Sequence, residues 1–86
     1  MNREINIARM EEGQTGIISG IIGGRNFRLK LESLGIRPGS KVTKVSNLFN
    51  RGPVVLHVGG TEVAIGYRMA RRILIKINTQ PLERSL

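Results

Sequence analysis

The stretch that decides the fold of this chain is Leu31-Glu32-Ser33-Leu34-Gly35-Ile36-Arg37-Pro38-Gly39-Ser40. Gly35 has no Cβ, so it can adopt the left-handed conformation that ends a helix. Pro38 fixes its own φ and lacks an N–H group, so the helix cannot resume there, and Gly39 suits the positive φ of a tight turn. The stretch therefore predicts the end of one short helix followed by a turn into a strand.

The helix that ends here is expected to begin after Asn26, whose side chain is suited to an N-cap. Phe27, Leu31 and Leu34 stand at i, i+4 and i+7 and form one apolar stripe. A helix of about nine residues is too short to be stable alone, so its stripe must pack on a sheet. Leu29 falls on the opposite side and is expected to be exposed.

Short strands account for most of the remaining chain. Residues 5–8 alternate as a first strand would, and residues 15–22 carry Ile on both faces, which indicates a central or strongly bent strand. Residues 41–47 read as a strand in which Val42 and Val45 are three apart. A bulge would reconcile these two positions, and bulges are common where barrel strands turn corners.

A hairpin and a last strand follow. Residues 54–58 and 61–65 flank Gly59-Gly60, a pair typical of a two-residue primed turn. The resulting register opposes His57 to Glu62 and places an apolar set on the core face, namely Val54, Leu56, Val58, Val63 and Ile65. A single helical turn at 67–71 precedes a strand with Ile73, Ile75 and Ile77 facing inward.

This pattern predicts a mainly β fold, a small and nearly closed β-barrel of five to six short strands with one short α-helix. The 86 residues are expected to form one domain, residues 1–77, with a disordered tail at 78–86. No apolar run approaches the roughly 20 residues that a bilayer span needs, and the first residues lack the apolar region of a signal peptide. The absence of cysteine fits a reducing cytoplasm.

The net charge is +8, from 14 Lys and Arg against 6 acidic residues. Such a charge favours an anionic partner, which can be nucleic acid, a membrane surface or an acidic protein patch. The cations are scattered, with the densest groups at Arg25-Arg28-Lys30 and Arg68-Arg71-Arg72. Proteins that bind single strands usually stack bases on several rings. With one Tyr, two Phe and no Trp, this composition does not favour nucleic acid.

The pair His57 and Glu62 is a candidate metal site, because imidazole and carboxylate suit Fe²⁺ or Zn²⁺. The alternative is an ordinary cross-strand surface pair. A stable site needs three or four protein ligands, and the sequence shows no third candidate nearby. A site completed by a second molecule or by a terminus stays open.

Two further patterns have simple structural alternatives. Gly23-Gly24-Arg25-Asn26 opens the helix and could hold a phosphate, but it lacks the Gly-Lys-Ser/Thr ending of a nucleotide loop, so turn chemistry explains it as well. Glu11 and Glu12 are adjacent in a turn and are expected to be solvated. With one His and no Asp, no serine has an evident base, so we expect no enzyme activity.

Four apolar residues do not fit the inward stripes: Leu29, Leu48, Phe49 and Leu74. They form a contact patch, or they close the ends of the barrel; the sequence leaves both readings open.

The order of these elements resembles the FeoA family of small cytoplasmic proteins of ferrous-iron uptake, over residues 5–77. The resemblance rests on the helix–Gly–x–x–Pro–Gly block at residues 31–39 together with a Gly-Pro-Val block at residues 52–55. Further markers are Gly13, Gly16, Gly60, Val63-Ala64-Ile65-Gly66, Ala70 and Ile73-Leu74-Ile75. The same module looks like the C-terminal domain of metal-dependent repressors, but the chain lacks their DNA-binding helices.

The resemblance implies an SH3-like barrel and an accessory or regulatory role at FeoB, a membrane transporter with a cytosolic G domain. It also implies transition-metal binding, with Fe(II) or Zn(II). We expect a cytoplasmic protein, a monomer or weak homodimer, peripheral to the inner membrane through its partner. The predicted contact residues are Leu48, Phe49 and Arg51, with Arg28 and Leu29. The alternatives are a basic small barrel that binds nucleic acid and a metal-sensing module.

Overall fold

A computed structural model describes residues 2–47 and 51–78 of the chain. In chain order its elements are β1 (Asn2–Asn6), the 3-10 helix η1 (Ile7–Arg9), β2 (Thr15–Ile21), α1 (Arg25–Glu32), β3 (Lys41–Asn47), β4 (Val54–Val58), β5 (Thr61–Ile65), α2 (Tyr67–Ala70) and β6 (Ile73–Asn78). Among these helices, none is both long and apolar enough to cross a bilayer.

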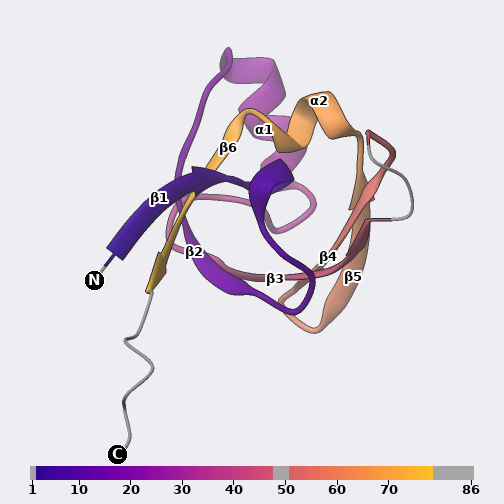
Figure 1. Cartoon of the computed structure of the whole chain (residues 1–86). Helices are drawn as coiled ribbons and strands as arrows, with labels where there is room; N and C mark the ends of the chain where they lie inside the picture. The colour runs from indigo at the N-terminus through magenta and orange to yellow at the C-terminus, as the bar shows by residue number, and fades with distance from the viewer. Residues whose placement is uncertain (1, 48–50, 79–86) are drawn as a thin grey trace, which may run out of the picture.

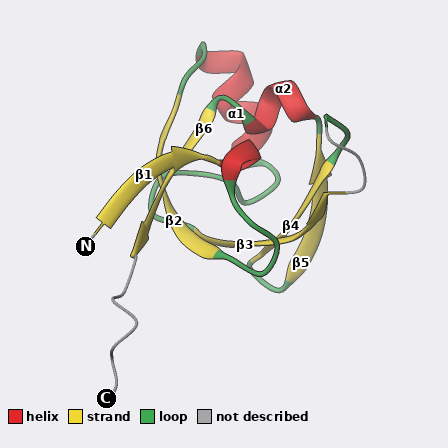
Figure 2. Cartoon of the chain, viewed as in Figure 1, coloured by secondary structure: helices red, strands yellow, loops and turns green. Residues whose placement is uncertain are grey.

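All six strands form one antiparallel sheet in the order β1-β6-β2-β3-β4-β5. The sheet curls around a common core, while the helices gather at one end (Figures 1 and 2). β1 and β5 are the two edges and do not pair with each other. η1 and α2, which follow these two edge strands, contact each other across the opening. The expected mainly β small barrel is confirmed, with an open seam in place of full closure.

The stretch from Leu31 to Ser40 forms the predicted helix stop. Gly35 has a φ of 86°, its N–H donates to the Glu32 carbonyl at 2.9 Å, and the Ile36 N–H donates to the Leu31 carbonyl at 3.0 Å. These two hydrogen bonds constitute a Schellman motif. The Gly39 N–H then donates to the Ile18 carbonyl at 2.8 Å, which fastens the turn to β2.

The start of α1 differs from the prediction. Gly24 is the N-cap, so Asn26 lies inside the helix and caps nothing. The residue before this cap must be small, because a Cβ at Gly23 would lie 2.6 Å from the Phe27 ring. Leu31 is fully buried and Phe27 is half-buried, whereas Leu34 follows the helix and is 37% exposed. The apolar stripe is therefore shorter than predicted.

The predicted bulge in β3 is confirmed, with a shift of register against β4 between Lys44 and Ser46. The bulge does not bring Val45 into the core, however. Val42 is fully buried, Val45 is 39% exposed, and Lys44 is buried in its stead at 3% exposure.

The β4–β5 hairpin has the predicted register, from Val58 opposite Thr61 to Val54 opposite Ile65. Gly59 and Gly60 both have positive φ, as a type I′ turn requires. The predicted core face of this hairpin is buried, apart from the half-buried Val63.

The ends of the domain differ from the prediction by a few residues. The first strand covers Asn2–Asn6, because Asn6 ends it by accepting the Arg9 N–H on its side-chain oxygen and so capping η1. β6 includes Asn78, and its three inward isoleucines, Ile73, Ile75 and Ile77, are buried as predicted. The expected disordered tail beyond Asn78 lies outside the described residues.

Candidate functional site

The predicted contact residues fall in two separate places. Arg28 and Leu29 lie on the exposed side of α1 and line a depression of about 490 Å³, where Leu29 is 48% exposed as predicted. Arg51 lines a different depression at the seam. Leu48 and Phe49 lie outside the described residues, so their role stays a prediction.

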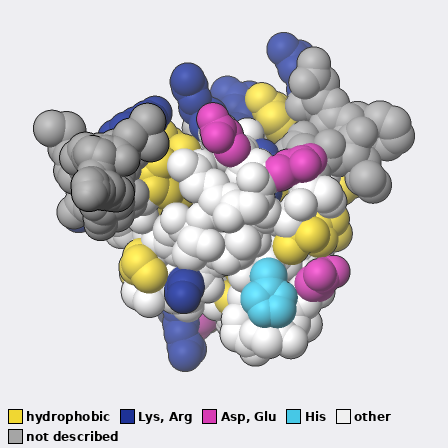
Figure 3. Space-filling view, turned by 60° about the horizontal axis from the view of Figure 1, so that its bottom comes forward, with side chains coloured by type: hydrophobic (Ala, Val, Ile, Leu, Met, Phe, Trp, Pro, Cys, Tyr) yellow, Lys and Arg dark blue, Asp and Glu magenta, His cyan; other side chains and the backbone are white. Residues whose placement is uncertain are grey.

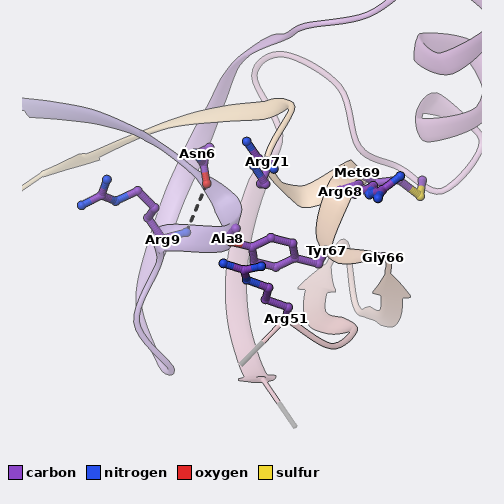
Figure 4. A pocket seen from close by; sticks show the side chains of 9 residues that line it. All are labelled: Asn6, Ala8, Arg9, Arg51, Gly66, Tyr67, Arg68, Met69 and Arg71. Atoms are coloured by element: carbon purple, nitrogen blue, oxygen red, sulfur yellow. Dashed lines mark hydrogen bonds between the residues drawn. The ribbon is translucent and has the colours of Figure 1, made fainter. Parts of the chain in front are cut away.

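The depression at the seam is the larger one, with a volume of about 990 Å³. It is lined by four arginines, Arg9, Arg51, Arg68 and Arg71, together with Asn6, Ala8, Gly66, Tyr67 and Met69 (Figure 4). We call it the arginine depression. Among the described residues, no carboxylate belongs to this lining.

Three chain segments bring these arginines together. Arg9 ends η1, Arg51 precedes β4, and Arg68 with Arg71 belongs to α2 and the residue that follows it. All four are exposed, whereas the Tyr67 ring between them is half-buried. The Arg71 guanidinium carbon lies 6.0 Å from the centroid of this ring, within the range of a cation–π contact.

A smaller depression of about 290 Å³ shares Arg68 and Met69 with the arginine depression. It is completed by Phe27 and Lys30 of α1 and by Arg72. The Arg72 guanidinium carbon lies 5.5 Å from the centroid of the Phe27 ring. The positive charge therefore extends from η1 across α2 to α1.

The buried Lys44 holds one wall of the arginine depression. Its Nζ donates to the Met10 carbonyl at 2.6 Å and to the Ala8 carbonyl at 3.3 Å. Burial lowers the pKa of this ammonium below its ordinary value, and the negative charge of Glu12 opposes part of the shift. Because the two carbonyls belong to η1 and its end, Lys44 fixes the position of η1 beneath the seam.

Sequence reasoning found only parts of this site. It identified Arg68-Arg71-Arg72 as a dense group and Arg51 as a contact residue, but it gave Arg9 and Tyr67 no role. Arg9 and Tyr67 are far apart in the sequence, and they meet only because the ends of β1 and β5 approach each other across the seam. The periodicity of apolar residues in either segment contains no signal for this contact.

The candidate metal pair has the predicted geometry. His57 and Glu62 are directly opposite across β4 and β5, and both are exposed. Figure 3 shows the imidazole on the surface beside an acidic side chain. Within residues 2–47 and 51–78, no group of three or more His, Cys, Asp or Glu side chains could hold a metal ion. The pair would thus supply two ligands and need others.

The N-terminus of α1, considered above as a phosphate site, is explained by packing. Gly23 lacks a Cβ because the Phe27 ring occupies the space, which favours the simple turn over a phosphate loop.

Comparison with known proteins gives consistent results. The family model described as "FeoA domain" matches residues 5–77. A curated relative from Methanocaldococcus jannaschii, named "Putative Fe(2+) transport protein A", is 33% identical over 70 residues, which cover 81% of this chain and 83% of the relative.

Two solved structures have the same fold as this chain. A crystal structure of the iron uptake regulatory protein FeoA is 34% identical, covers 87% of this chain and 99% of its own, and has a TM-score of 0.79. The zinc complex of Stenotrophomonas maltophilia FeoA, described as a procaryotic SH3 domain protein, is 17% identical, covers 83% and 88%, and has a TM-score of 0.70. At 17% identity, the similarity to this zinc complex shows a shared fold and nothing more. This chain, an SH3-like barrel matched from residue 5 to residue 77, belongs to the FeoA family.

Proposed function

We propose that this protein is an accessory factor of ferrous-iron uptake that binds the cytosolic G domain of a FeoB-type transporter and acts there without catalysis. Membership of the FeoA family carries the proposal, because the relatives are named for iron(II) transport and iron uptake regulation. In this role the protein works in the cytoplasm and reaches the inner membrane through its partner.

The exposed side of α1 supports protein binding. Leu29 stands 48% exposed between cations of the same helix, including Arg25 and Arg28. Leu29 shares this depression with the half-buried Ile21 and with Pro38, and an apolar cluster with a charged rim is typical of protein contacts. We propose two contact regions for the G domain: Arg28 and Leu29 on α1, and Arg51 at the seam, with Leu48 and Phe49 predicted to join Arg51.

The test is a titration of the isotope-labelled protein with the cytosolic G domain of a FeoB-type transporter, followed by NMR. We expect shifts at α1 and Arg51, and weaker binding by Leu29→Ala. Ile17→Ala is the matched control, because Ile17 is 44% exposed on β2 and lines none of these depressions. Unchanged spectra at high micromolar excess of the G domain would contradict the proposal.

Divalent metal binding is a second candidate, supported by the register of His57 opposite Glu62. A second molecule would complete the ligand set for Fe²⁺ or Zn²⁺. Calorimetry with each ion should give heat with the wild type and none with His57→Ala. Equal heats from both proteins would dismiss this pair.

A further inference from the structure

We propose that the arginine depression binds an acidic, extended peptide segment of a protein partner. This inference rests on the proposed function in one respect: it takes the partner to be a protein. It adds where on the molecule that partner is recognised and what chemistry the recognised segment has.

The positive charge of the depression favours an acidic ligand. Arg9, Arg51, Arg68 and Arg71 line one depression, and the part of its lining that residues 2–47 and 51–78 supply contains no carboxylate. Four cations gathered in this way repel one another unless an anion lies among them. Guanidinium groups pair with carboxylates through two parallel hydrogen bonds, so acidic side chains fit this lining well.

Part of the lining of the depression is uncharged. The lining includes three uncharged, half-buried residues, Ala8, Tyr67 and Met69. Apolar surface among cations suits a segment in which apolar side chains alternate with carboxylates. A free inorganic anion would leave this apolar surface unused.

The arginines are spread widely over the depression. In Figure 4, Arg51 lies beside the Tyr67 ring, whereas Arg9 and Arg68 point away from it on opposite sides. The volume of about 990 Å³ is at the upper end of small-molecule pockets, and the charge continues into the smaller depression through Arg72 and Lys30. A single phosphate would reach only part of this surface, while an extended segment could cross it.

The same geometry disfavours two other anionic partners. Single-stranded nucleic acid usually stacks its bases on several free aromatic faces, but among the described residues of the lining Tyr67 is the one ring, and Arg71 already lies 6.0 Å from its centroid. A bilayer presents a flat surface, whereas the site is hollowed. The wall formed by η1 is held by the hydrogen bonds of Lys44, so this part of the backbone is in place before binding.

The test measures the anisotropy of a fluorescent peptide of alternating glutamate and leucine, with the matched glutamine–leucine peptide for comparison. We expect the full chain to prefer the glutamate peptide, and the affinity to fall as salt rises. The double variant Arg51→Gln/Arg71→Gln should bind about tenfold more weakly. The control Arg3→Gln/Lys76→Gln removes two exposed cations from β1 and β6 and should change affinity less than about twofold.

Three results would overturn the inference: equal binding of the two peptides, equal affinity of the Arg51→Gln/Arg71→Gln variant and the wild type, or tighter binding of single-stranded DNA, inorganic phosphate or anionic vesicles than of the glutamate peptide. The G domain titration separates the two proposals. If the G domain binds wild type and double variant equally, docking through Arg28 and Leu29 stands, whereas the arginine depression and the contact at Arg51 fail. If the glutamate peptide binds while the G domain does not, the site stands and the transporter proposal fails.

Discussion

Replacing Lys44 by methionine tests whether its buried ammonium holds η1 in place. Methionine keeps an unbranched apolar stem but removes the donor to the Met10 and Ala8 carbonyls. A hydrogen bond from a charged group contributes about 1.5–3 kcal/mol. The bond to Met10 is short, at 2.6 Å, whereas the bond to Ala8, at 3.3 Å, is longer than most N–H···O bonds, and burial of the charge opposes part of the gain. We therefore expect Lys44→Met to lower the free energy of unfolding by about 2 kcal/mol.

Urea denaturation followed by circular dichroism measures this change, with Lys41→Met as control. Lys41 lies on the same strand but is exposed, so its replacement should stay within about 0.5 kcal/mol of the wild type. In a domain of this size, 2 kcal/mol corresponds to a fall in Tm of roughly 10 °C. A Lys44→Met protein as stable as the control would refute the reasoning.

The pH dependence gives an independent readout of the same residue. Burial lowers the pKa of Lys44 in the folded protein. Between that lowered pKa and the ordinary value of 10.5, the unfolded chain binds more protons than the folded protein. Stability of the wild type should therefore rise with pH in this window relative to Lys44→Met. A constant difference between the two proteins would contradict a lowered pKa.

Three further substitutions test the fold. Gly35→Ala should cost about 1–2 kcal/mol, because its φ of 86° strains any residue with a Cβ, whereas Gly20→Ala should be nearly neutral. Gly16→Ala should cost about 1–3 kcal/mol, because its Cβ would lie 3.0 Å from atoms of β6. Leu56→Ala should cost about 2–5 kcal/mol since Leu56 is fully buried, while Val45→Ala, at a position 39% exposed, should cost far less. Urea midpoints check all three. A reversed order within either pair, or a Gly16→Ala protein as stable as Gly20→Ala, would contradict the assignment of these residues.

Local signals predicted most of the fold, because they act through neighbours in the sequence. Gly35 and Pro38 fix the helix stop by backbone conformation alone, and Gly59-Gly60 fixes the register of the hairpin by its turn type. The bulge in β3 was also visible, as a break in alternation. The sequence did not show which side chain the bulge would bury. Lys44 turns inward because carbonyls of η1 and its end, about 35 residues earlier, accept hydrogen bonds from its ammonium group.

The candidate site was less predictable for the same physical reason. The pair of His57 and Glu62 follows from a two-residue turn, so the sequence placed it correctly. The arginine depression depends on η1 meeting α2, a contact between distant segments that no periodicity encodes. Its charge could be counted from the sequence, but the hollow whose lining includes Arg9, Arg51 and Tyr67 could not be predicted.

The strand order has a consequence for synthesis on the ribosome. β6, the final strand of the domain, inserts between β1 and β2, so the first strand has no neighbour in the sheet until the last one has been translated. Before that moment β2 exposes an unpaired edge of the kind that promotes aggregation, and pairing between distant segments is slow. The nascent chain can assemble the β2–β5 meander early. It cannot enclose its core until residues 73–78 leave the exit tunnel.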